Sequence, residues 1–153
     1  MVEAPPVPRL KGDTLELMQR VWKLAHALEV ASKRMARTLG VTGPQRLVVR
    51  MIGLHPTITA QAIASTLGMH PSTLTGVLAR LEARRLIVRV ADPADRRRAR
   101  FTLSAAGRRV DRERKGTVEA AVRRALARKP SDVASALALL DTMIEEIDRE
   151  VHV

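Results

Sequence analysis

Residues 59–104 carry the pattern that most constrains the fold: two helix-like stretches separated by a glycine, then two β-prone runs around an arginine-rich turn. The second helical stretch runs from Pro71 to about Arg84, and its proline suits a first helical position, where no N–H group is needed. Apolar residues recur there at three- and four-residue steps, which predicts one buried stripe formed by Leu74, Val77, Leu78 and Leu81. The spacing predicts a helix-turn-helix with 71–84 as its recognition helix.

The opposite face of the recognition helix carries short side chains and one cation, namely Ser72, Thr73, Thr75, Gly76, Ala79 and Arg80. Short side chains let a helix approach the major groove of DNA closely, where hydroxyls bond phosphates or base edges and arginine binds guanine. An ordinary solvated face is the alternative. We expect these residues to contact double-stranded DNA.

A β-hairpin is predicted after Leu86, with strands at 87–91 and 99–103 around an Asp-Pro turn. Its tip concentrates Arg96, Arg97 and Arg98. Arginines on a slim hairpin beside a recognition helix suit a minor groove, which is narrow and strongly negative. A loop that carries them only for solubility is the weaker explanation. The hairpin is therefore predicted to be a DNA-binding wing.

The wing resembles the signature of the MarR family of multiple antibiotic resistance-type regulators. Asp95-Arg96-Arg97 is followed by Leu103-Ser104 and then Gly107, as in that family, and the run from Ile63 to Thr75 is similar to the family's helix-turn-helix. The resemblance extends from about residue 10 to the C-terminus, in that the predicted helices and strands follow one another in the same order as in the family. It implies that Arg97 enters the minor groove and that Asp95 braces it by a salt bridge.

Three residues depart from the family pattern. Gly76 stands where relatives often carry a larger or basic residue, and His70 replaces the usual Ser or Asp cap of the recognition helix. Arg85 replaces the glycine that usually turns the chain into the wing. Either Arg85 adopts a left-handed conformation or the corner is built differently.

Composition and charge favour a polyanionic partner. The 153 residues have a formal net charge of +11, which suits binding to a polyanion such as nucleic acid. Only Trp22 and Phe101 are aromatic, and from the length and composition we expect one mainly α domain. Absence of cysteine excludes thiol-based sensing, and no apolar run is long enough to span a membrane. We expect a cytoplasmic, nucleoid-associated protein with no membrane partner.

The predicted fold is mainly α with a small β-hairpin wing: a winged helix-turn-helix with N- and C-terminal dimerisation helices. Residues 1–11 are expected to form a flexible arm, 12–40 a dimerisation helix, 41–104 the DNA-binding domain, and 105–153 the C-terminal helices, again for dimerisation. A single long helix is expected from Ser104 to about Arg128. In 131–153, apolar residues alternate at steps of four and three, as in helix-on-helix packing.

The resemblance implies a homodimeric, ligand-responsive transcriptional repressor on a pseudo-palindromic operator. Its half-sites should lie about one DNA turn apart, roughly 10 to 10.5 base pairs. A small, often aromatic or anionic effector would enter a pocket between the dimerisation helices and the DNA-binding domain. Candidate lining residues are Trp22, His26, Arg46 and Arg50, with core packing for Trp22 and solvation for the arginines as alternatives.

Other functions find little support in the sequence. The four histidines are scattered, so no metal site or cofactor is expected, and no nucleophile elbow or phosphate-binding glycine loop indicates an enzyme. The main alternative is a winged-helix module that binds another protein, or that organises DNA, without any small-molecule response.

Overall fold

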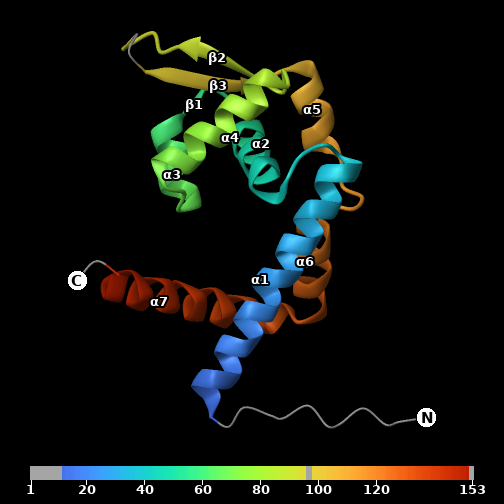
Figure 1. Cartoon of the computed structure of the whole chain (residues 1–153), viewed down its shortest axis with the longest axis vertical. Coiled ribbons are helices and arrows are strands. Elements are labelled where there is room, and N and C mark those ends of the chain that lie inside the picture. The colour runs from blue at the N-terminus through green and yellow to red at the C-terminus, as the bar shows by residue number, and fades with distance from the viewer. Residues whose placement is uncertain (1–11, 96–97, 152–153) are drawn as a thin grey trace. The chain divides into compact units, whose positions relative to one another are not determined.

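The computed structural model describes residues 12–95 and 98–151. The chain forms two compact units, which meet in sequence between Glu113 and Arg114. The first unit contains α1 (Asp13–Thr38), α2 (Gly43–Leu54), β1 (Ile58–Thr59), α3 (Ala60–Leu67), α4 (Pro71–Ala83), β2 (Ile87–Ala91), β3 (Ala99–Leu103) and α5 (Ala105–Arg112) (Figure 1). The second contains α6 (Val118–Arg128), a 3-10 turn η1 (Pro130–Asp132) and α7 (Val133–Val151).

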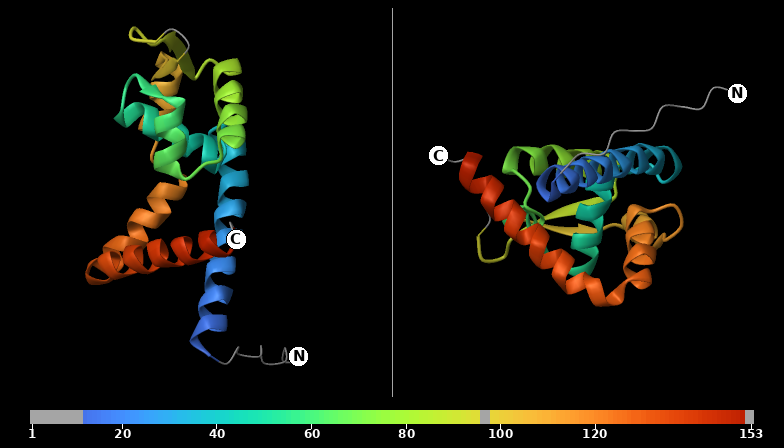
Figure 2. Two further views of the ribbon diagram at one scale, coloured as in Figure 1. Left: turned by 90° about the vertical axis from the view of Figure 1, so that its left-hand side faces the viewer. Right: turned by 90° about the horizontal axis from the view of Figure 1, so that it is seen from below.

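The predicted fold class is confirmed: the structure is mainly helical, with a winged helix-turn-helix built from α3, α4 and the β2–β3 hairpin. The hairpin lies at one edge of its unit in Figure 1 and in the left-hand view of Figure 2. Its strands pair antiparallel, with Ile87 opposite Leu103 and Ala91 opposite Ala99. The short strand β1 pairs with β3 and completes a sheet of order β1-β3-β2, which the sequence did not predict.

The core of the first unit forms where α2, α3, α4 and the sheet meet. All four residues of the predicted stripe on α4 are buried, with exposed fractions of at most 5%. Phe101 on β3 closes the core from the sheet and is 1% exposed. Burial of these apolar side chains holds the recognition helix α4 in one orientation, because rotation of α4 about its axis would expose the apolar stripe to water.

Side chains cap several helix ends. Thr42 and Gln45 form a reciprocal capping box at the start of α2, and Ser104 accepts a hydrogen bond from Gly107 N–H at the start of α5. The His70 ring caps α4 by accepting from Ser72 N–H over 3.3 Å. Gly68, with φ +59°, provides the left-handed residue that ends α3. These local signals fix where the helix-turn-helix bends.

The corner into the wing takes the first of its two predicted forms. Arg85 has φ +55°, a left-handed conformation that costs a residue with a Cβ about 1–2 kcal/mol. The Arg85 carbonyl accepts a hydrogen bond from Ser104 Oγ over 2.7 Å, which ties the corner to the start of α5. The left-handed corner is thus formed by a residue other than glycine.

The single long helix predicted from Ser104 to Arg128 is wrong, because the chain forms two helices there. Residue Glu113 is extended at the end of α5, and Gly116 has φ +70°, which a helix cannot contain. Thr117 then starts α6 by accepting from Ala120 N–H over 3.2 Å. The break coincides with the boundary between the two compact units.

Apolar side chains remain exposed along α1 and α7. Trp22 on α1 is 69% exposed, so the alternative that it packs in the core of its own chain is wrong. None of the residues of α7 is buried, although its predicted apolar seam includes Ile144 and Ile147, which are 56% and 57% exposed. Within the described ranges, no helix is both long and apolar enough to cross a membrane.

Candidate nucleic-acid interface

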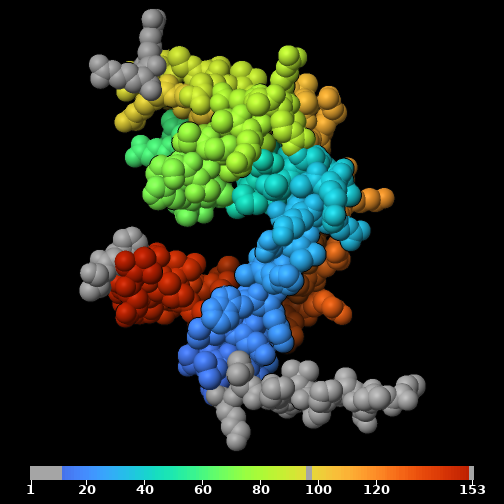
Figure 3. All heavy atoms as spheres, viewed as in Figure 1, coloured from blue at the N-terminus to red at the C-terminus, as the bar shows by residue number. Residues whose placement is uncertain are grey.

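The exposed face of α4 carries the hydroxyl and cationic side chains expected there. Ser72, Thr73, Thr75 and Arg80 are all exposed, and Gly76 lies among them. Among the described residues, no atom beyond the neighbouring backbone of α4 lies within 4 Å of a Cβ placed on Gly76. The atoms of α4 and of the wing form one continuous part of the face seen in Figure 3. The side chains that the sequence assigned to the recognition face therefore lie on one accessible surface.

Two of these hydroxyls also interact with the first turn of α4. Thr75 Oγ1 donates to the Pro71 carbonyl over 2.9 Å, and Ser72 Oγ lies 2.7 Å from His70 Nδ1. A hydroxyl that donates one hydrogen bond still has lone pairs to accept another. The local bonds thus orient the oxygens while leaving them able to accept from a base amino group.

The arginines of the wing tip are only partly described. Arg96 and Arg97 lie outside the described residues. The expected salt bridge between Asp95 and Arg97 therefore stays a prediction. Arg98 Nε lies 3.6 Å from Asp95 Oδ2, and the Arg98 N–H donates to the Asp95 carbonyl over 2.9 Å. These contacts hold the two ends of the tip close together.

A second aspartate anchors the base of the wing tip. Asp92 is 5% exposed and forms an ion pair with Arg100 Nε at 2.9 Å, while its Oδ1 accepts from Ala94 N–H over 2.9 Å. The Arg100 guanidinium first, and then the Ala94 N–H, hold the pKa of the Asp92 carboxyl below its ordinary value. This role of Asp92 was not predicted, although the Asp-Pro turn between two strands was a signal for it.

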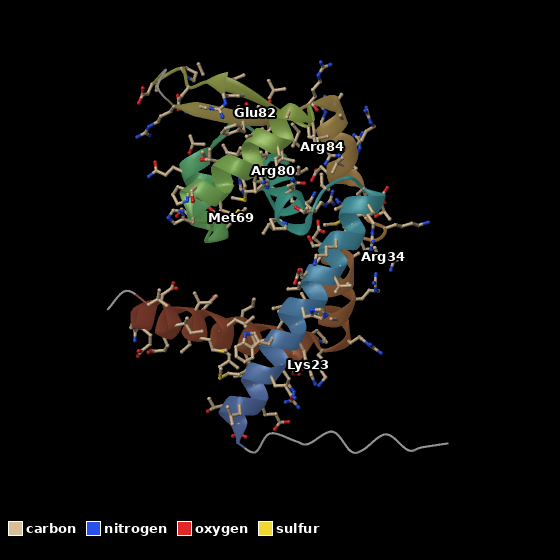
Figure 4. The ribbon with its side chains drawn as sticks, viewed as in Figure 1. Lys23, Arg34, Met69, Arg80, Glu82 and Arg84 are labelled. Atoms are coloured by element: carbon tan, nitrogen blue, oxygen red, sulfur yellow. The ribbon has the colours of Figure 1, made fainter. Side chains whose placement is uncertain are left out.

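A charged contact joins α4 directly to the wing. Arg89 on β2 donates to the Glu82 carboxylate twice, from Nε to Oε1 over 2.9 Å and from Nη2 to Oε2 over 3.1 Å. The same guanidinium lies over the Phe101 ring, with Cζ 5.1 Å from the ring centroid. Glu82 lies beside the strands in Figure 4, whereas Arg80 belongs to the exposed recognition face. Neither Glu82 nor Arg89 was singled out from the sequence.

The four candidate ligand-pocket residues are divided between two places. Trp22 and His26 line an open hollow on α1, together with Leu15, Met18, Gln19 and Lys23. Arg46 is 1% exposed and binds the backbone at the end of α5, while Arg50 Nη1 lies 2.7 Å from Asp111 Oδ1. The structure does not bring the two arginines together with the α1 hollow. Among the described residues, no three His, Cys, Asp or Glu side chains gather as metal ligands would.

Comparison of folds places this geometry in a known class, the winged helix-turn-helix proteins. The DNA complex of MepR from S. aureus has 18% identity, with 84% of this chain and 96% of that chain covered and a TM-score of 0.73. FabT of Streptococcus pneumoniae, also in complex with DNA, has 20% identity, 88% and 99% coverage and a TM-score of 0.70. PcaV of Streptomyces coelicolor, with its natural ligand, has 23% identity, 92% and 97% coverage and a TM-score of 0.66.

Residues 39–98 match the MarR family model, a segment that runs from the end of α1 to the wing tip. A search of curated protein sequences gave no match. The helix-turn-helix and wing segment of this chain is therefore similar to the MarR family, and the chain shares the fold of the solved structures above.

Proposed function

We propose that the protein is a homodimeric, sequence-specific repressor of transcription that binds a pseudo-palindromic operator. The observation that carries this proposal is the position of the exposed hydroxyl-rich face of α4 beside an arginine-bearing wing, on a MarR-family fold. In this arrangement α4 reads the major groove through Ser72, Thr73, Thr75 and Arg80, with Gly76 allowing close approach. The wing arginines hold the adjacent minor groove.

The charge of the chain supports a duplex as the partner. Seven arginines and two aspartates lie between Arg84 and Arg100, whereas residues 131–153 contain six acidic residues and one arginine. Phosphate binding by the first stretch releases counterions and favours association, while the acidic stretch is repelled by DNA. The two stretches are therefore suited to different tasks, and the acidic one is suited to assembly.

A second copy of the chain is the partner that best fits the exposed apolar side chains of α1 and α7. A 19-residue helix with no buried residue cannot gain its stability from packing within one chain. Its apolar seam has the spacing of helix-on-helix packing, and pairing of two copies would bury it. Dimerisation also gives the operator its twofold symmetry, because each subunit presents one α4.

A small-molecule effector would act on this dimer by favouring one spacing of the two recognition helices. PcaV was solved with its natural ligand, which makes a ligand-responsive mechanism reasonable for a protein of this fold. The exposed ring of Trp22 and the nearby His26 form the candidate site on α1. The ligand could shift the equilibrium only through a difference in its affinity for the two states.

The proposal is tested by footprinting and by measuring assembly. DNA flanking the protein's own gene is the natural probe, and protection of a pseudo-palindrome of about two DNA turns is expected. The logarithm of the binding constant should fall with the logarithm of salt concentration by about 0.9 per phosphate contact. Sedimentation equilibrium should give a dimer. A monomer that binds every duplex equally would overturn the proposal in favour of the architectural alternative.

A further inference from the structure

We infer that Glu82 and Arg89 form a positioning strap that fixes the wing relative to the recognition helix. Neither residue would contact DNA itself. This inference rests on the proposed function, since it concerns how one subunit grips two grooves at once. The pairing of β3 with β1 and the buried Phe101 hold the base of the wing, and a contact from α4 to the edge strand β2 limits how far the hairpin can tilt away from α4. Simultaneous contact of α4 and the wing tip with DNA requires a fixed distance between them.

The geometry of the contact is that of a rigid connection. Both guanidinium edge nitrogens engage both carboxylate oxygens, at 2.9 and 3.1 Å, so rotation about a single bond cannot keep the pair intact. The Glu82 side chain is 28% exposed and that of Arg89 is 55% exposed, which leaves the pair partly shielded from water. A two-point contact of this kind fixes an angle as well as a distance.

The Phe101 ring extends the strap into the core. Arg89 and Phe101 are paired across β2 and β3, and the guanidinium stacks over a ring that is 1% exposed. Stacking on one side and the carboxylate at its edge hold the planar group in place. The strap therefore connects the end of α4, the edge strand of the wing and the buried core in one line of contacts.

The charge of Glu82 distinguishes a positioning role of the Glu82–Arg89 pair from a direct contact of Arg89 with DNA. An unpaired carboxylate on α4, close to a duplex, would repel phosphates, but pairing with Arg89 cancels that charge. If Arg89 served as a phosphate contact, Glu82 would weaken it, and removal of Glu82 would strengthen DNA binding. If the pair is a strap, removal of Glu82 weakens DNA binding even though a negative charge has gone.

The test is a set of variants of the full chain, measured for operator affinity across a salt series. Glu82→Gln and Arg89→Gln should each weaken binding about tenfold, with the slope against salt unchanged because no phosphate contact is lost. Arg89→Lys should behave like Arg89→Gln, since lysine keeps the charge but cannot bind both oxygens in plane. The exchanged double variant, Glu82→Arg with Arg89→Glu, should recover most of the affinity.

Other outcomes identify what has failed. Tighter binding by Glu82→Gln, or full activity of Arg89→Lys with a shallower salt slope for Arg89→Gln, would overturn the strap and make Arg89 a phosphate contact. Wild-type binding by all the variants would show that the wing needs no strap. Failure of the wild-type protein to bind any operator would instead contradict the proposed function. Circular dichroism melting curves within a few degrees of wild type exclude unfolding as the cause of a loss.

Discussion

The buried guanidinium of Arg46 donates a hydrogen bond to the Glu113 carbonyl over 2.7 Å. It also donates to Asp111 O over 3.1 Å and to the carbonyl of Val110. These carbonyl groups lie at the C-terminal end of α5, where the last carbonyls of a helix generally lack donors from the helix itself. The Val110 carbonyl also accepts from Glu113 N–H over 3.2 Å. One arginine of α2 thus caps α5 and fixes the last residue before the chain enters its second compact unit.

Replacement of Arg46 should therefore destabilise the protein strongly. Arg46→Met removes the donor of three part-buried hydrogen bonds, and we expect the free energy of unfolding to fall by about 3 kcal/mol. Urea denaturation measures this loss. Arg109→Met is the matched control, because Arg109 is exposed on α5 and its loss should change stability by less than about 0.5 kcal/mol. Equal stability of the two variants would contradict the capping role.

Replacement of Arg85 by glycine should stabilise the protein by about 1 kcal/mol, because glycine adopts φ +55° without a Cβ penalty. The hydrogen bond from Ser104 uses the Arg85 carbonyl and survives the substitution. The control is Arg84→Gly, at φ −87°, which should lower stability because no strain is relieved there. Thermal unfolding of both variants shows whether the gain is specific to the left-handed position.

Replacement of Gly76 by alanine should raise stability but weaken DNA binding. In the part of the chain that the structure describes, nothing beyond the neighbouring backbone of α4 lies within 4 Å of a Cβ at this position, so Gly76→Ala should raise the free energy of unfolding by about 1 kcal/mol. If α4 approaches the major groove closely, operator affinity should fall, by about tenfold or roughly 1.4 kcal/mol. Unchanged affinity in a gel shift would mean that the backbone does not approach the bases.

Gly107 provides the opposite case and serves as the control for Gly76. A Cβ at Gly107 would lie 2.0 Å from the Leu86 carbonyl oxygen, so Gly107→Ala should lose both stability and DNA binding together.

The contribution of Asp92 at the base of the wing to protein stability should depend on pH in the acid range. The folded-state pKa of Asp92 lies below its ordinary value of 3.8, because Arg100 and the Ala94 N–H favour the carboxylate. Its contribution to stability is therefore complete above about pH 4 and is lost as the pH falls through the depressed folded-state pKa. Melting curves between pH 5 and about 2 should show this loss, and Asp92→Asn should be less stable at pH 5 but less sensitive to acid. Parallel acid profiles for the two proteins would contradict the assignment.

Arg97→Ala tests the residue that the family resemblance assigns to the minor groove. Operator binding should weaken by about 1 to 3 kcal/mol, and the salt slope should become shallower if a phosphate contact is also lost. Gel shifts on the footprinted operator measure the effect. Arg109→Ala on α5 is the control for a simple loss of positive charge, and an equal effect of the two substitutions would remove the wing tip from the proposed interface.

Much of the winged helix-turn-helix could be predicted because its signals are local. The buried stripe of α4, the Thr42 capping box, the Ser104 cap and the left-handed Gly68 all depend on residues within a few positions of one another. The candidate DNA-contacting residues followed from the same periodicity, since burying one face of α4 leaves the other exposed. Helical spacing and capping are properties of the chain itself.

Tertiary structure decided the contacts between residues distant in sequence. The run Leu47-Val48-Val49 is uniformly apolar, and only packing left Leu47 44% exposed while burying Val49. The pairing of β1 with β3 joins Ile58 to Phe101, and a two-residue strand has too few side chains to show a period of its own.

Arg46 is the clearest example of this limit. Its sequence neighbourhood suggested a solvated or ligand-binding arginine, but the carbonyl groups that it caps lie more than sixty positions further along the chain. The sequence by itself determined where helices begin, end and turn their apolar faces. The folded chain determined which charged side chains find buried partners, because burial of a charge is tolerated only where distant groups supply its hydrogen bonds.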